Sequence, residues 1–300
     1  MTECAWGAPP LTLSHTRTHA PHPSQYCDGS SLTSDLAAPL VVNGTALHLR
    51  GRALLDAHIA ELDANFNFSA SATEVIVGGT SAGGLAAHLH APLFAALLPR
   101  ARVVAVPDAA WWFDTTAHNS TTKRPWLDMM TPAVALWNSS FNPANPAAAA
   151  CAAANAAAPV RCLTQPYQAA FSSVPTFHAQ SLYDIYNLGY CYAMPCQMAG
   201  NAPGTCTAAE VADIQGFAAR MRASLEGAAR AGDGWFLQGC SQHETTCRAA
   251  DWFGVASPSG ATMNSTFAEW YSGTGPGREV DAAWPLDASC QAAGFDHGFC

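Results

Sequence analysis

Residues 74–84 read EVIVGGTSAGG, and this short stretch decides the fold class. Its first half is a β-branched apolar run, which is typical of a strand buried on both faces of a parallel sheet. Two glycines end the run, and the alanine- and leucine-rich residues 83–98 then predict a helix. Ser81 lies between the predicted strand and the predicted helix, in the pattern G-x-S-x-G. A tight strand-to-helix turn of this kind lifts the serine hydroxyl clear of the sheet.

The alternation of strand and helix patterns continues along the chain. Residues 102–106, RVVAV, predict a second buried strand and complete a strand–helix–strand unit. Further strands are expected at 174–178 and 235–239, and amphipathic helices at 45–62 and 208–230. We therefore predict an α/β protein with a mostly parallel sheet flanked by helices, built as a single domain with insertions.

Two segments fall outside this alternation. Residues 142–159 are alanine-rich and low in complexity, and they predict either a surface insertion or a short helical cap. Residues 272–300 contain glycine and proline, and we expect this tail to wrap the surface, tied down by Cys290 and Cys300.

The composition excludes several classes of protein. The chain has 300 residues, of which 49% are hydrophobic and 12% charged, so it can bury a full core and is not intrinsically disordered. Its formal charge of -9 supplies no basic face, and we expect no nucleic-acid partner. The longest apolar runs are too short for a membrane span.

Cysteines and glycosylation motifs point to a secretory route. The eleven cysteines lack any C-x-x-C pair, which favours disulfide bonds over a metal site, and the odd count leaves one thiol over. Five N-x-S/T motifs, at Asn43, Asn67, Asn119, Asn138 and Asn264, agree with a secreted glycoprotein. Residues 1–23 have neither a basic segment nor an apolar run of signal-peptide length, so we expect the signal peptide to be missing from this sequence.

A serine nucleophile needs a histidine base to accept its proton. His243 follows the expected fourth strand in a loop that Cys240 and Cys247 are predicted to pin, and it is the candidate base. His88 and His90 lie within the helix after Ser81 and are expected to face its surface, and His178 belongs to the third strand.

The base in turn needs an acid that orients it. Asp184 follows the third strand, at the edge of the sheet where such an acid belongs. Asp108 and Asp114 follow the second strand and compete with it, and chain order alone does not separate Asp184 from Asp114. Glu244 is adjacent to the base, and its side chain is expected to point elsewhere. The N–H of Ala82, at the start of the helix, is a candidate oxyanion donor.

Taken together, the motifs match one known family. The blocks that carry the match are YCDGSS at 26–31, GGTSAGG at 78–84, PDAAWWFD at 107–114, Tyr183-Asp184, GCSQH at 239–243 and EWY at 269–271. In this order they resemble the pectin acetylesterase and Notum carboxylesterase family of α/β hydrolases. The resemblance implies an α/β-hydrolase-like, disulfide-bonded fold and a catalytic triad of Ser81, Asp184 and His243.

The sequence departs from the family's pattern at two places. The family's glycine-rich segment, which supplies further oxyanion donors, has no match before Cys27. We therefore expect an irregular segment at 1–25 and a hydrolase domain at 26–300 that lacks its N-terminal strand and oxyanion segment, with a truncated start. Ala109-Ala110 stands where the family commonly has Ser-Gly.

The expected function is removal of O-acetyl groups from pectin-like cell-wall polysaccharide through an acyl-enzyme, without metal or organic cofactor. Trp111, Trp112 and Phe113 follow the second strand and either line the substrate pocket or pack in the core. A Notum-like deacylase of protein and a non-catalytic polysaccharide-binding glycoprotein are the alternatives, so the expected partner is an acetylated polysaccharide or another ester.

Overall fold

The structure is a computed structural model that describes the backbone of residues 11–15 and 21–24 and the whole of residues 28–196, 204–246, 248–284 and 290. The expectations for Cys4, Cys27, Cys247 and Cys300 lie outside these residues.

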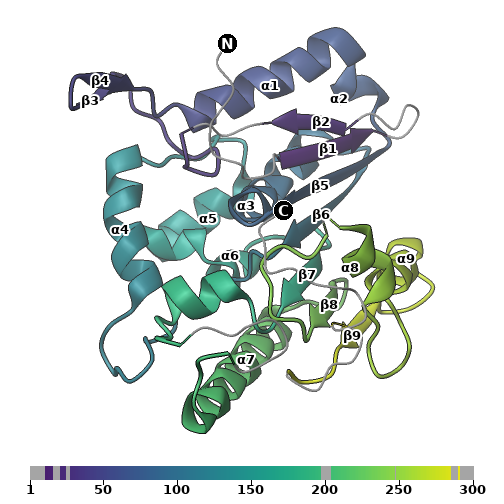
Figure 1. Ribbon diagram of the computed structural model, residues 1–300. Helices are drawn as coiled ribbons and strands as arrows, with labels where there is room; N and C mark the ends of the chain where they lie inside the picture. Colours follow the sequence, from purple (N-terminus) through teal and green to yellow (C-terminus); the bar gives the residue numbers. More distant parts are fainter. Residues whose placement is uncertain are drawn as a thin grey trace.

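Within the described residues, seven strands form one sheet in the order β2-β1-β5-β6-β7-β8-β9 (Figure 1). Its five consecutive parallel strands are β5 (Glu74–Thr80), β6 (Arg102–Asp108), β7 (Phe177–Ser181), β8 (Gly234–Gln238) and β9 (Arg278–Val280). Strands β1 (Leu11–His15) and β2 (Pro21–Ser24) extend it antiparallel beyond β5. The mostly parallel sheet expected from the sequence is thus confirmed.

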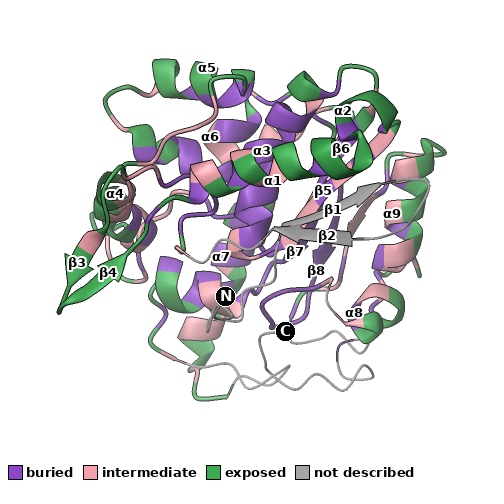
Figure 2. Ribbon diagram, turned by 90° about the horizontal axis from the view of Figure 1, so that it is seen from above, coloured by how far each residue is buried: buried purple, intermediate pink, exposed green. Residues whose placement is uncertain are grey.

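Helices cover both faces of the sheet. They are α1 (Gly51–Phe66), α2 (Phe68–Ser71), α3 (Ala82–Leu97), α4 (Pro125–Trp137), α5 (Pro146–Ala154), α6 (Gln165–Ala169), α7 (Ala208–Ala228), α8 (Ala249–Gly254) and α9 (Met263–Ser272), with a short 3₁₀ turn, η1 (Pro159–Leu163), and a π turn, η2 (Asn187–Cys191). Figure 2 shows α8 and α9 on one side of the buried strands and α3 and α6 on the other.

The strands bury alternate side chains in separate cores, as period-two geometry requires. Val75 and Val77 of β5 pack with α1 and α3. Val104 of β6, Phe177 of β7 and Phe236 of β8 belong instead to the core under α8 and α9. Because both faces are covered, β5 and β6 read as apolar runs, and this is why the sequence revealed them.

Some boundaries differ from the sequence-based predictions. The helix expected at 45–62 begins at Gly51, because Asn43-Gly44 forms a turn with φ of 49° and 79° that folds β3 (Leu40–Val42) onto β4 (Thr45–Leu47). The third strand begins at Phe177, two residues after Pro175, which has no N–H to give to a ladder. Residues 1–25, expected to be irregular, contain β1 and β2.

The alanine-rich segment forms α5, which agrees with the expected short helical cap. Asn145 caps the helix by accepting a hydrogen bond from the N–H of Ala148 at 3.1 Å, and its amide donates to the Leu89 carbonyl of α3 at 2.9 Å. A disulfide between Cys151 and Cys162 joins α5 to η1.

The tail is an integral part of the sheet rather than only a surface wrap, since β9 pairs in parallel with β8. The disulfide partner of Cys240 is Cys290, so Cys240 ties the loop after β8 to the tail. The expectation for Cys247 lies outside the described residues. Among the described cysteines, Cys191 is free and buried. The grouping of Cys240, Cys290 and Asp281 has no metal-binding thiolates because its two sulfur atoms form this disulfide.

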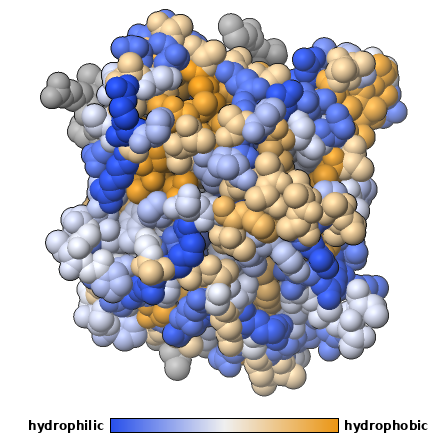
Figure 3. Space-filling model, turned by 180° about the vertical axis from the view of Figure 1, so that it is seen from behind, coloured by the Kyte–Doolittle hydropathy of each residue, from blue (hydrophilic) through white to orange (hydrophobic). Residues whose placement is uncertain are grey.

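The back of the molecule carries separate apolar patches among hydrophilic residues (Figure 3). Among the helices in the described part of the chain, none has the length and apolar character needed to cross a bilayer.

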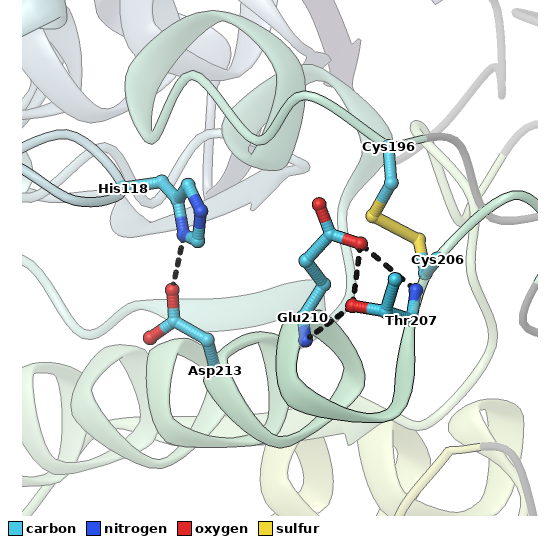
Figure 4. The surroundings of a disulfide bond; sticks show 6 residues. All are labelled: His118, Cys196, Cys206, Thr207, Glu210 and Asp213. Atoms are coloured by element: carbon cyan, nitrogen blue, oxygen red, sulfur yellow. Dashed lines mark hydrogen bonds and ion pairs between the residues drawn. A yellow bond between two sulfur atoms is a disulfide. The ribbon is translucent and has the colours of Figure 1, made fainter.

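Local capping explains where the long helix α7 begins. Thr207 accepts a hydrogen bond from the N–H of Glu210, whose carboxylate accepts one from the N–H of Thr207 at 2.8 Å (Figure 4). The Cys196–Cys206 disulfide lies directly before this cap. Beside it, His118 Nδ1 lies 2.5 Å from Asp213 Oδ2, which ties the segment after β6 to α7.

Candidate active site

Ser81 occupies the turn between β5 and α3, as the G-x-S-x-G pattern predicts. Its backbone has φ 52° and ψ -122°, a conformation that residues with a Cβ adopt only under strain. The Ser81 N–H donates to the Asp108 carbonyl at 2.8 Å, which anchors the turn to the next strand. A Cβ on Gly79 would lie 2.5 Å from the Gly83 carbonyl oxygen, so the turn has no room for a side chain at Gly79.

The crowding gives a prediction for Gly84. A Cβ there would lie 2.6 Å from the Asp108 carbonyl oxygen and 2.7 Å from the Ala110 Cβ. We expect Gly84→Ala to destabilise the fold by about 1–3 kcal/mol, as overpacking does. Gly216→Ala is the matched control, because the nearest atom is 3.5 Å away and alanine favours the interior of α7. Thermal unfolding of both variants measures this, and equal melting temperatures would contradict it.

Ser81, His243 and Asp184 form one chain of hydrogen bonds at the carboxyl edge of the sheet. His243 Nε2 lies 2.8 Å from Ser81 Oγ, and His243 Nδ1 lies 2.8 Å from Asp184 Oδ2. The side chains of His243 and Asp184 are fully buried. The Asn187 N–H donates to Asp184 Oδ1 at 2.9 Å and orients the carboxylate. This is the geometry in which an aspartate holds a histidine toward a serine hydroxyl.

The structure separates the three candidate acids that the sequence left open. Asp184 contacts His243 directly. Asp114 forms an ion pair with Arg124 instead. The carboxylate of Asp108 accepts hydrogen bonds from Thr245 and Thr246.

The other histidines of the helix after Ser81 are buried, so the expectation that they face the surface is wrong. His88 and His90 are 3% and 1% exposed, because α3 is covered on all sides from Gly83 to Phe94. Burial lowers the pKa of His88 to about 3 and that of His90 to about 4. Both are therefore neutral core residues.

Electrostatics at His243 favour its protonated form. Burial is the largest single effect and lowers the pKa of His243. The Asp184 carboxylate, Glu244 and Asp108 together raise it by more, so the net shift is upward from 6.5. A protonated histidine accepts no proton from Ser81. We therefore expect the rate of Ser81 acylation to fall as the pH decreases through a value above 6.5. The pH profile of kcat/KM measures this, and an acidic limb well below 6.5 would contradict it.

The three aromatic residues of the expected pocket are buried and differ in position. Trp111 and Phe113 pack in the core that includes α7, so of the two alternatives, pocket lining or core packing, core packing fits them. Trp112 belongs to the core that includes Leu85 of α3 and the half-buried Tyr186. Its ring centroid lies 6.2 Å from that of Tyr186, which stacks on His243 at 5.4 Å. Trp112 is therefore linked to the histidine through one ring.

Two neighbours of the triad, Tyr186 and Ser31, were not singled out as site residues from the sequence. Tyr186, stacked on His243, lies in no motif that identifies it. Ser31 belongs to the YCDGSS block, and its hydroxyl donates to the Ala82 carbonyl at 2.9 Å, which places this block against the start of α3. Ala82 is the first residue of α3, where N–H groups have no acceptor within the helix.

A mostly parallel sheet with a serine on a strand-to-helix turn, and a histidine and an aspartate after later strands, defines the α/β-hydrolase class of fold. The sequence profile of the pectinacetylesterase family matches residues 24–291, and the chain belongs to this family. The structure is similar to that of the Wnt deacylase Notum from Drosophila, with a TM-score of 0.71 and 18% identity, covering 91% of this chain and 75% of that one.

Curated relatives with similar sequences are named as pectin acetylesterases. Pectin acetylesterase 11 of Arabidopsis thaliana is 28% identical over 271 residues, and pectin acetylesterase 5 of the same plant is 25% identical over 285 residues. The alignments cover 86% and 90% of this chain but 66% and 64% of those proteins, so the chain spans about two thirds of their length.

Proposed function

We propose that this chain is a serine esterase that removes O-acetyl groups from pectin-like cell-wall polysaccharide. The observation that carries the proposal is the hydrogen-bonded chain from Asp184 through His243 to Ser81, with 2.8 Å at each of the two histidine nitrogens. Membership of the pectinacetylesterase family and the names of the Arabidopsis relatives support the acetyl ester as substrate.

The chemistry follows from this geometry. Ser81 Oγ attacks the ester carbonyl carbon while His243 Nε2 takes the hydroxyl proton, and the Ala82 N–H stabilises the oxyanion. His243 then gives the proton to the departing sugar oxygen, which leaves an acetyl group on Ser81. Water then attacks the acyl carbon while His243 takes a proton from it, the bond to Ser81 Oγ breaks, and His243 returns the proton to Ser81 Oγ as the acetyl group leaves as acetic acid. Asp184 holds the imidazole in the required tautomer throughout.

Trp112 is the proposed aromatic wall of the substrate site, and residues 26–300 form the proposed hydrolase domain.

The experiment is a comparison of substrates with one purified preparation. We expect acetate release from acetylated pectin, measured with an acetate-specific assay, and no release by Ser81→Ala. Hydrolysis of p-nitrophenyl octanoate much faster than p-nitrophenyl acetate would favour a Notum-like deacylase instead. Saccharide binding with no turnover of any ester would contradict the proposal and favour a non-catalytic binding protein.

We also propose that the protein is secreted and glycosylated. Asn43, Asn67, Asn119 and Asn138 are exposed, and all four adopt a positive φ at turns or helix ends. Asn264 is half-buried, and its side chain accepts a hydrogen bond from Trp252 Nε1 at 3.0 Å.

Glycan occupancy tests this localisation. Expressed through a secretory pathway, the chain is expected to carry N-glycans at Asn43, at the tip of the β3–β4 hairpin, and at the other three exposed sites. Peptide mass spectrometry before and after glycosidase treatment measures this. Secreted, folded chain without any glycan at the four exposed sites would contradict the prediction.

A further inference from the structure

Asp108 ends β6 between the turn that holds Ser81 and the loop that carries His243. Its carbonyl oxygen accepts the Ser81 N–H at 2.8 Å. Its carboxylate accepts from four donors, the N–H and hydroxyl groups of Thr245 and Thr246, at 2.6–2.9 Å. These threonines follow His243 by two and three residues. One residue thus contacts both the turn that holds Ser81 and the loop that follows His243.

Four donors facing one carboxyl group fit its ionised form, which has only acceptor oxygens. Asp108 is 1% exposed, and an unpaired carboxylate at such a position is costly. The two backbone N–H groups can only donate, so they require acceptor oxygens. Burial raises the pKa of Asp108, and the hydrogen bonds from Thr245 and Thr246 oppose this, with a net shift upward. An asparagine of the same shape would supply one acceptor oxygen and turn an NH₂ group toward one of the donors.

The loop needs such an anchor because its backbone is strained. Glu244, between His243 and Thr245, has φ 61°, a conformation that persists only when the surroundings enforce it. A second contact acts at the same place, since Thr80 Oγ1 donates to Glu244 Oε1 at 3.2 Å. Thr80 is the residue before Ser81, so both ties join the nucleophile turn to the histidine loop.

We propose that Asp108 is a positioning residue that holds the His243 loop against the Ser81 turn and so fixes the distance from His243 Nε2 to Ser81 Oγ. The inference rests on the proposed esterase function and deepens it. The hydrogen bonds of Asp108 go to the Ser81 N–H, Thr245 and Thr246, and not to Ser81 Oγ or His243 Nε2. Asp108 acts through Thr245 and Thr246, and its negative charge also contributes to the environment of His243, together with Asp184 and Glu244.

The first test compares Asp108→Asn with Asp233→Asn. Asp233 is also buried and accepts hydrogen bonds from the N–H groups of Thr176 and Arg230, but it lies at the opposite, amino end of β8. We expect Asp108→Asn to lower kcat for p-nitrophenyl acetate by about 10²-fold with KM nearly unchanged, because misplacement by about 1 Å costs that much. We expect its acidic limb in the pH profile to move to lower pH, because a negative charge near His243 is lost. Asp233→Asn should lower the melting temperature and leave kcat, KM and the acidic limb unchanged.

A second pair of variants keeps Asp108 in place, in case Asp108→Asn does not fold. Thr245 is fully buried, and its hydroxyl donates to Asp108 Oδ1 at 2.6 Å. Thr245→Val removes this donor with little change of shape, and we expect kcat to fall by about tenfold. Thr245→Ser keeps the hydroxyl and should retain most of the activity.

The outcomes separate this inference from the proposed function. An active wild-type chain with kcat and acidic limb unchanged in both Asp108→Asn and Thr245→Val would overturn the positioning role and leave the esterase proposal standing. A wild-type chain that hydrolyses no ester would overturn the esterase proposal and this inference with it. Loss of kcat in Asp108→Asn and Thr245→Val, but not in Asp233→Asn or Thr245→Ser, supports the role.

Discussion

Replacing Ser81 with alanine is expected to lower ester hydrolysis by about 10⁴ to 10⁶-fold, since removal of a serine nucleophile eliminates the acyl-enzyme route. The fold should survive, because Ser81→Ala removes one oxygen atom and keeps the backbone bond from Ser81 N–H to the Asp108 carbonyl. Initial rates with p-nitrophenyl acetate and acetylated pectin measure the effect.

A matched control is Ser31→Ala. The Ser31 hydroxyl donates to the Ala82 carbonyl beside the nucleophile, yet it makes no hydrogen bond to His243 in the described structure. We expect a loss far smaller than that of Ser81→Ala. If Ser81→Ala hydrolysed esters as fast as the wild-type chain, the nucleophile would be a group other than Ser81.

Replacing Asp184 with asparagine is expected to lower kcat by about 10⁴-fold, the size of effect that follows when the histidine loses its orienting carboxylate. An amide in place of Asp184 Oδ2, now 2.8 Å from His243 Nδ1, turns an N–H toward that nitrogen and favours the tautomer with the proton on Nε2. A proton on Nε2 prevents His243 from accepting the one on Ser81. Loss of the carboxylate also removes the charge that raises the pKa of His243.

Asp114→Asn is the control for the acid. It was an equal candidate by chain order, but its carboxylate pairs with Arg124. We expect kcat of Asp114→Asn to stay within about tenfold of the wild-type value, as expected when no transition-state contact is lost. A larger loss in Asp114→Asn than in Asp184→Asn would show that the acid was assigned to the wrong residue.

The sequence predicted the parts of the fold that depend on local patterns. The strand before Ser81 and the helix after it were found almost to the residue, because a strand covered on both faces is apolar throughout. The hairpin at 40–47 was missed. Its second strand was included in the predicted helix at 45–62, since three exposed residues after a turn resemble the start of a helix. Strand β9 has three half-buried residues and no apolar run, so periodicity gave no signal there.

The site was predictable only where a motif fixes the residue. The strand-to-helix turn led to Ser81 and the position after the fourth strand to His243, whereas only the family resemblance selected Asp184 over Asp114. The structure brings Ser81, His243 and Asp184 together. The burial of His88 was not predictable, because the helix is covered on every side only in the complete fold. Contacts between residues distant in sequence, such as Asp108 with Thr245, depend on the spatial order of β6 and β8 and leave no local pattern.

The most direct measurement is labelling with a fluorophosphonate probe, mapped by peptide mass spectrometry. A nucleophile activated by a buried His243 should react through Ser81 alone, and a His243→Ala variant should lose the labelling. Labelled Ser81 in the wild-type chain, absent in His243→Ala, is the result we predict. A folded chain that remains unlabelled, or that is labelled equally in both forms, would contradict a serine nucleophile activated by His243.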